Sequence, residues 1–149
     1  MYYLVRPIPA KELKPGDWFR AANDHNFKIK DIDRTNKVVE IEYYTGTRDY
    51  FVSFFVSPER IIDVIIDKEG SIMKHTLITL RPTNGTDLAP KDRIRLNGTL
   101  YDVIDNQIHT GENLWYELTA REGLTDEIQT IEYTEGTIFD VVTNIREEN

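Results

Sequence analysis

The chain has 149 residues, a formal net charge of −8 and a hydrophobic fraction of 40%. That hydrophobic fraction is typical of a folded protein and excludes a disordered one. The acidic charge argues against binding to a phosphate backbone as the main task. The absence of cysteine excludes disulfides and thiolate metal sites.

The N-terminal segment, MYYLVRPIP, has only a short apolar run that Arg6 and Pro7 interrupt. It therefore lacks the pattern of a signal peptide, and no apolar run in the chain reaches the length of a membrane span. We expect a protein of the cytoplasm or of a virion that is not secreted by a signal peptide and has no membrane partner.

The first half of the chain alternates short strand-like runs with turn residues. These runs fall at residues 2–5, 18–20, 27–32, 39–44, 50–56 and 61–66, with short helical turns at 9–13 and 57–60. Ile32 is out of phase with Ile29, which predicts a bulge near Asp31. The run 50–56 is apolar on both faces, so we expect the other half of the chain to cover one of them.

The second half continues in the same style. Its strand-like runs fall at residues 73–80, 93–96, 99–104, 114–120, 128–134 and 137–145, and residues 81–86 read as a polar loop. The pair Asn97-Gly98 is the strongest hairpin signal, because both residues tolerate positive φ. The last two runs predict a final hairpin about Glu135-Gly136.

The second half is also a blurred copy of the first. Leu13, Pro15, Asp17, Phe19 and Arg20 recur 75 positions later (88 − 13 = 75) as Leu88, Pro90, Asp92, Ile94 and Arg95. Ile29 then corresponds to Val103, 74 positions later, and Val39, Ile41 and Tyr43 correspond to Leu114, Tyr116 and Leu118, 75 positions later. Ile62-Asp63-Val64-Ile65 returns as Phe139-Asp140-Val141-Val142, 77 positions later.

Short strands, frequent turns and this repeat predict an all-β fold made of two tandem small SH3-like barrels with short helical turns. The first barrel covers residues 1–70 and the second residues 71–149, with the boundary in the turn at 67–72. The alternation of apolar residues predicts a core of Phe27, Ile29, Val39, Ile41 and Tyr43 in the first half and of Ile94, Tyr101, Val103, Leu114, Tyr116 and Leu118 in the second.

No catalytic motif, phosphate-binding loop or metal-ligand spacing is found in the sequence, so we predict no catalytic residue, no metal site and no cofactor. The three histidines read as surface or packing residues. The carboxylate pairs Asp31/Asp33 and Glu40/Glu42 are the one basis for an enzyme hypothesis.

Several aromatic residues fall on phases that the two cores do not need. They are Trp18 and Tyr44 in the first half and Trp115 in the second, and we predict that these three contact a partner. The alternative is that the two halves bury them against each other, because a barrel this small has little core of its own.

One segment resembles a known family. Asp92-Arg93-Ile94, Asn97-Gly98, Tyr101–Ile104 and Tyr116–Arg121 are similar to the barrel of tailed-phage head–tail connector (head-completion or stopper) proteins. The first half, from Pro15 to Tyr43, is similar to small bacterial SH3-like domains. A connector normally has a single barrel, whereas this chain repeats the pattern. The resemblance implies a virion component that docks onto other protein chains in a homo-oligomeric ring.

Three functions are therefore open. The first is a non-catalytic structural or interaction protein that docks onto other protein chains, in its most specific form a phage head–tail connector or neck component. The second is an acidic inhibitor that mimics nucleic acid, with its carboxylates gathered on one face. The third is an enzyme built on a carboxylate pair, with a concave pocket around it.

Overall fold

The computed structural model describes residues 2–46, 50–66 and 75–148, and within them it contains strands and two short 3₁₀ turns but no α-helix. The strands of the first half are β1 (Tyr3–Pro9), β2 (Trp18–Ala21), β3 (His25–Arg34), β4 (Val39–Tyr44), β5 (Phe51–Val56) and β6 (Ile61–Ile65). Those of the second are β7 (His75–Asn84), β8 (Arg93–Leu96), β9 (Thr99–His109), β10 (Trp115–Glu122), β11 (Ile128–Tyr133) and β12 (Ile138–Glu148). The 3₁₀ turns are η1 (Ala10–Glu12) and η2 (Gly85–Asp87). The predicted all-β class is confirmed.

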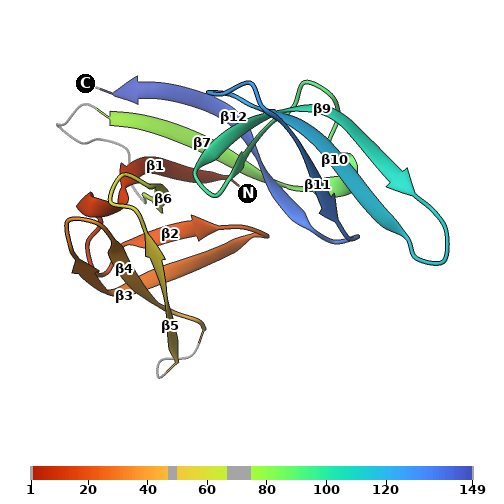
Figure 1. The fold of residues 1–149 in the computed structure, drawn as a ribbon. Helices are drawn as coiled ribbons and strands as arrows, with labels where there is room; N and C mark the ends of the chain where they lie inside the picture. Colours follow the sequence, from red (N-terminus) through yellow and green to blue (C-terminus); the bar gives the residue numbers. More distant parts are fainter. Residues whose placement is uncertain (1, 47–49, 67–74, 149) are drawn as a thin grey trace.

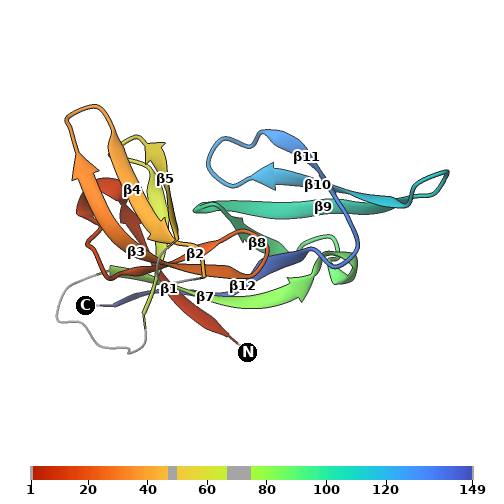
Figure 2. The same ribbon diagram turned by 90° about the horizontal axis from the view of Figure 1, so that it is seen from below.

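All twelve strands form one antiparallel sheet in the order β11-β10-β9-β8-β12-β7-β1-β6-β2-β3-β4-β5 (Figure 1). Read outward from its centre, each half has the same order, with β1 to β6 matched one to one by β7 to β12. Figure 2 shows β3–β5 and β9–β11 as two wings that rise on the same side of the strands between them. The repeat in the sequence is thus a repeat in topology.

The halves meet at β1 and β7, which pair symmetrically. Val5 lies opposite Ile78 and Tyr3 opposite Leu80, with Leu4 and Thr79 between them. In the sequence repeat Val5 is equivalent to Leu80 and Tyr3 to Ile78. The pair Val5–Ile78 is therefore equivalent to the pair Leu80–Tyr3. A pseudo-two-fold axis therefore passes between Leu4 and Thr79.

Prolines inside strands are placed where the sheet is open on one side. Pro7 pairs with Asp63, and its repeat equivalent, Pro82, pairs with Asp140. Within the described residues β1 and β7 pair only over Tyr3–Val5 and Ile78–Leu80, so neither proline there has a second neighbouring strand that would need its missing N–H. This is why residues 81–84 continue β7, whereas the sequence pattern predicted a polar loop there.

The predicted bulge near Asp31 is confirmed by a register shift between Ile29 and Asp31. The shift between Thr119 and Ala120 on β10 leaves the same bulge on β9, since Val103 and Asp105 are the residues that pair on its two sides.

Aligning the two bulges corrects the repeat. Beyond them, β3 pairs Ile32 with Ile41, and β9 pairs Asn106 with Leu118. Ile41 therefore corresponds to Leu118, 77 positions later (118 − 41 = 77), and not to Tyr116. The hairpin joining β9 and β10 is longer than its counterpart, and a change in length at a turn leaves the alternation of the strands intact.

That shift explains the one wrong residue in the predicted core. Leu114 is 52% exposed, because it lies in the longer turn before β10. The other predicted residues are either buried or packed against the cores. The first half gathers Ala10, Leu13, Phe19, Ile29, Val39, Ile41 and Val64, with Phe27 and Tyr43 against them, and the second half gathers Leu88, Ile94, Val103, Tyr116, Leu118, Tyr133, Phe139 and Val141, with Tyr101 against them.

Two further sequence-based predictions are wrong. Residues 128–133 and 138–148 do not form a hairpin, since β11 pairs with β10 while β12 pairs with β7 and β8. Residues 57–60 form a turn without helix. Local alternation identified these strands, but the choice of partner depends on the long-range packing of each half.

Closure into two barrels is not confirmed. β5 pairs only with β4, and β11 only with β10, so within the described residues the sheet ends at these two strands. The predicted boundary at 67–72 lies outside the described residues. The two halves are bound into one sheet, and the edges that closure would have removed remain open.

Two ion pairs, one buried and one partly buried, join the halves across the pseudo-two-fold axis. Arg20 of β2 donates two hydrogen bonds to Asp140 of β12, at 2.8 and 2.7 Å. Its repeat equivalent, Arg95 of β8, donates two to Asp63 of β6, both at 2.9 Å. Each arginine thus reaches the aspartate of the other half. Bidentate pairing of this kind fixes the orientation of the groups it joins.

Candidate aromatic groove

Trp18 and Tyr44, both predicted to contact a partner, line the same hollow of about 860 Å³. Trp18 is 48% exposed. The hollow lies where β2, β3 and β4 end, and its other lining residues are His25, Asn26, Phe27, Lys28, Thr45 and Gly46. We call this hollow the aromatic groove. The alternative, in which the halves bury Trp18 against each other, is therefore wrong.

The register of the sheet brings these residues together. Trp18 lies opposite Lys28 on β3, and Ile29 lies opposite Tyr43 on β4, which sets Lys28 beside Tyr44. Tyr44 in turn lies opposite Phe51 on β5. Residues that are directly opposite share one face of a sheet, so an aromatic, a basic and two further aromatic side chains form a row across four strands.

The electrostatics of the groove differ from those of the whole chain. No aspartate or glutamate is among its lining residues, although the chain carries a net charge of −8. Lys28 is exposed, and the next basic residue on its strand, Lys30, holds its ammonium 4.3 Å from the centre of the Phe51 ring and 3.5 Å from the Glu42 carboxylate. Lys28 therefore gives the groove a local positive charge.

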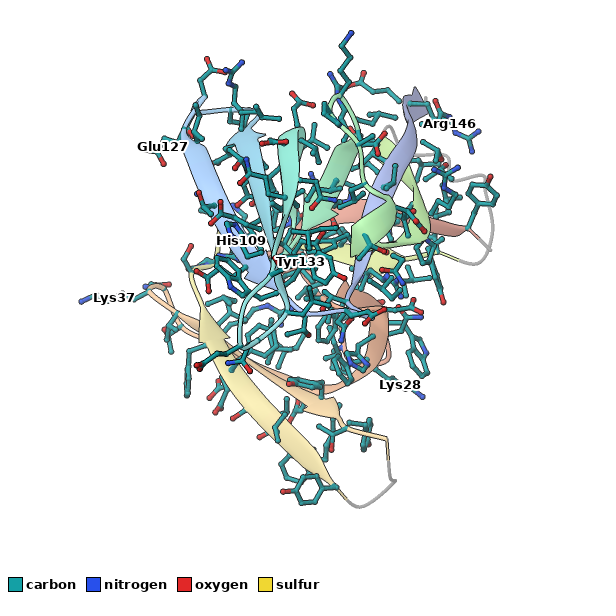
Figure 3. The ribbon with its side chains drawn as sticks, turned by 90° about the vertical axis from the view of Figure 1, so that its right-hand side faces the viewer. Lys28, Lys37, His109, Glu127, Tyr133 and Arg146 are labelled. Carbon is teal, nitrogen blue, oxygen red and sulfur yellow. The ribbon has the colours of Figure 1, made fainter. Side chains whose placement is uncertain are left out.

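Trp115 does not belong to this site. It lies on β10 in the second half, where its ring stacks on His109 at a centroid distance of 3.9 Å. In Figure 3 His109, which stacks on Trp115, is labelled near the middle of the view, and Lys28, which lies opposite Trp18, at the lower right. Of the three predicted residues, the structure brings two together and leaves the third apart.

The groove also contains residues that the sequence did not single out. The sequence predicts Phe27 as a core residue and His25 as a surface or packing residue, and the structure stacks the two rings at 5.8 Å and places both in the lining of the groove. The alternation of Phe27-Lys28-Ile29-Lys30 was visible in the sequence, but only the pairing of β3 with both β2 and β4 reveals that Lys28 lies between Trp18 and Tyr44.

The carboxylate pairs behave as surface residues. Asp31 and Asp33 are exposed, and Asp31 accepts a hydrogen bond from the backbone N–H of Ile32. Glu42 is paired with Lys30. In the part of the chain that the structure describes, no group of three or more histidine, aspartate or glutamate side chains is placed to hold a metal ion.

Among the described residues, no helix has the length and apolarity that crossing a membrane requires. Comparison of the chain with models of protein families, with curated proteins and with solved structures finds no match.

Proposed function

We propose that the protein is a non-catalytic interaction protein that docks onto other protein chains through the aromatic groove. The observation that carries the proposal is the convergence of Trp18 and Tyr44, which are far apart in the sequence, on one basic hollow. Tryptophan and tyrosine are the residues that most often dominate the binding energy of protein interfaces.

The chemistry of the groove favours a particular partner. Its aromatic walls fit an extended segment with apolar side chains, and the charge of Lys28 favours a segment that also carries carboxylates. Small β modules of the SH3-like class take peptides in aromatic grooves, and the SH3-like interpretation of each half is part of this proposal. The partner is thus an acidic segment of a protein chain.

The resemblance of the second half to head–tail connectors makes a virion component the most specific form of this proposal. A neck protein works by docking onto neighbouring chains and needs no catalytic group. This version places the protein in a virion, whereas the general version fits the cytoplasm equally well.

The alternative of nucleic-acid mimicry has less support. Carboxylates on both halves are engaged in ion pairs: Asp24 and Asp140 with Arg20, Glu42 with Lys30, Glu59 with Lys11, Asp63 with Arg95 and Asp102 with Arg93. Paired carboxylates present less net charge than the unpaired array that a mimic of a phosphate backbone needs.

The test is a selection from a random displayed peptide library on the full chain, with counter-selection on the Trp18→Ala variant. We expect peptides rich in acidic and aromatic residues that bind the wild type, lose at least tenfold in affinity with Trp18→Ala or Lys28→Glu, and bind Trp115→Ala unchanged. Loss of binding in Trp115→Ala alone, or equal enrichment on Trp18→Ala, would contradict the proposal.

A further inference from the structure

The strand β5 forms one edge of the sheet, and no strand of the described residues pairs with its outer backbone groups (Figure 1). The backbone N–H of Thr45 donates to the carbonyl of Tyr50 at 3.2 Å, so these two residues form a hydrogen-bonded pair in line with β4 and β5. Such pairs alternate along antiparallel strands. It follows that the N–H and C=O groups of Phe51, Ser53 and Phe55 point away from β4.

β5 has none of the features that keep an edge strand from pairing with another chain. Its six residues, FVSFFV, include no charge and no proline, and its pairing with β4 has no bulge. Phe51 is 46% and Phe55 65% exposed, so the expectation that the other half covers this face is wrong for the described residues. Edge strands of folded proteins usually carry a charge, a proline or a bulge that prevents pairing with another chain.

The equivalent strand in the second half provides an internal comparison. Counting from the paired positions on β4 and β10, Ile128, Thr130 and Glu132 of β11 correspond to Phe51, Ser53 and Phe55. The second edge thus carries a charge where the first carries a phenylalanine. The difference between two edges of the same topology indicates that the apolar one is used.

We propose that β5 pairs antiparallel with β5 of a second copy of the chain, around a two-fold axis at Ser53. In that register Phe51 lies opposite Phe55 of the partner, Val52 opposite Phe54, and Ser53 opposite its own copy. The residues with outward backbone groups face each other, as hydrogen-bonded pairs require. The same arrangement at β11 would place Ile128 opposite Glu132, which is a poor match.

Self-pairing satisfies both the backbone and the side chains of this edge. A two-fold interface requires a surface that complements itself, and the sequence Phe-Val-Ser-Phe-Phe is apolar on both sides of a small central residue. Phe54, which packs on the core of the first half, would lie opposite Val52 of the second copy, so the pairing would extend that core across the axis. The molecule already joins its own halves in this manner at β1 and β7.

Charge sets the conditions under which the dimer forms. Each copy carries a net charge of −8, and Glu40 and Glu42 lie on the strand next to the edge. Like charges repel over about 10 Å at moderate salt, and added salt screens them. The dimer should therefore become tighter as the salt concentration rises.

The first test compares two proline variants of the full chain by sedimentation velocity and light scattering over a range of concentrations. Ser53→Pro removes an outward N–H and leaves the hydrogen bonds to β4 intact. The matched control is Thr130→Pro, at the equivalent outward position of β11. We expect a concentration-dependent dimer for the wild type and for Thr130→Pro, and a monomer for Ser53→Pro. The melting temperature of Ser53→Pro should match that of the wild type at concentrations where the wild type is monomeric.

The second test uses the absence of native cysteine. In the proposed register the Cα atoms of the two Ser53 residues are about 5.5 Å apart, a distance that a disulfide spans. Ser53→Cys should cross-link into a dimer under mild oxidation, while Thr130→Cys should remain a monomer on a denaturing gel.

A wild type that is monomeric at every concentration and salt, a Ser53→Pro variant that still dimerises, or equal cross-linking of both cysteine variants would overturn the proposal. The result is independent of the aromatic groove, because Trp18→Ala is expected to leave the dimer unchanged and Ser53→Pro to leave peptide binding unchanged.

Discussion

The two halves have separate cores of the same topology, and one equivalent corner of these cores is polar in the second half and apolar in the first. In the second half the hydroxyl of Tyr133 donates to the carbonyl of Gly85 at 2.9 Å or to the side-chain oxygen of Asn106 at 2.5 Å. Figure 3 shows Tyr133 near the middle of the molecule. The amide of Asn106 also donates to the carbonyls of Gly85 and Leu88. This corner is therefore a hydrogen-bonded network.

In the first half the equivalent residues are Val56, Ala10 and Ile32, all apolar and all part of the core. The sizes change together: a Cβ added at Gly85 would lie 2.5 Å from the Tyr133 ring, whereas Ala10 carries that methyl beside a smaller valine. One backbone arrangement thus accepts a polar or an apolar filling, provided that every buried polar group has a partner.

The largest effects are expected from truncating residues at equivalent positions of the two cores. Ile41 and its equivalent Leu118 are both fully buried, so Ile41→Ala and Leu118→Ala should each lower the free energy of unfolding by about 2–5 kcal/mol. Urea denaturation measures both. Losses well under about 1 kcal/mol for both variants would contradict their place in the core.

The reciprocal ion pairs test the symmetry of the interface between the halves. Asp140→Ala leaves the buried Arg20, and Asp63→Ala the partly buried Arg95, without its main partner. The loss costs about 3–5 kcal/mol for a fully buried pair. We expect both near the lower end, because Arg20 keeps its bond to Asp24 at 2.6 Å and the Arg95 side chain retains 11% exposure.

The two losses should be nearly equal in urea denaturation. Burial lowers the pKa of Arg20, but its hydrogen bonds to Asp140 and Asp24 together raise it by a larger amount. The pKa therefore lies above its ordinary value and the group stays charged. A large loss for one variant and none for the other would show that the halves are not held symmetrically.

The coupling among the residues of this corner can be tested by replacing the second-half residues with their first-half equivalents. Gly85→Ala alone should cost about 1–3 kcal/mol, because the new methyl meets the Tyr133 ring. A Cβ at Gly85 would also lie 2.9 Å from the Phe139 ring, so the background that copies the first half is Tyr133→Val, Asn106→Ile and Phe139→Ile, after Val56, Ile32 and Ile62. In that background the same substitution should cost much less. A thermodynamic cycle from urea denaturation checks this, and an equal cost in both backgrounds would refute the coupling.

The smallest effect is a pH dependence confined to the second half. Burial raises the pKa of Tyr133, and its hydrogen bond to Asn106 opposes part of that shift. The unfolded tyrosine ionises near pH 10, before the folded one, so stability should be full below that pH and be lost as the pH rises through the folded pKa. Tyr133→Phe should flatten this alkaline loss in denaturation curves measured on both sides of pH 10.

Much of the local structure was predictable from the sequence. Alternating apolar residues predicted most strands, and the phase slip at Ile32 predicted the bulge. The Asn97-Gly98 pair correctly predicted a hairpin. In the structure these two residues have φ of 51° and 78°, and Leu96 pairs with Thr99 on either side of them. Each of these features depends on a few neighbouring residues, whose steric preferences the sequence states directly.

The repeat and the aromatic phases carried some long-range information as well. They predicted two halves of one pattern and singled out Trp18 and Tyr44, which share the groove. They also produced the error at Leu114, because a repeat detected by eye does not reveal where a turn gains residues.

Only the tertiary structure decided which strands pair across long distances. Residues 128–133 and 138–148 lie close in sequence but pair with different strands, and β1 pairs with β7 although more than sixty residues separate them. The ion pair between Arg20 and Asp140 follows from that pairing, as does the open edge at β5. A strand carries hydrogen-bonding groups on both sides regardless of its sequence, so its neighbours are chosen by the packing of the whole sheet.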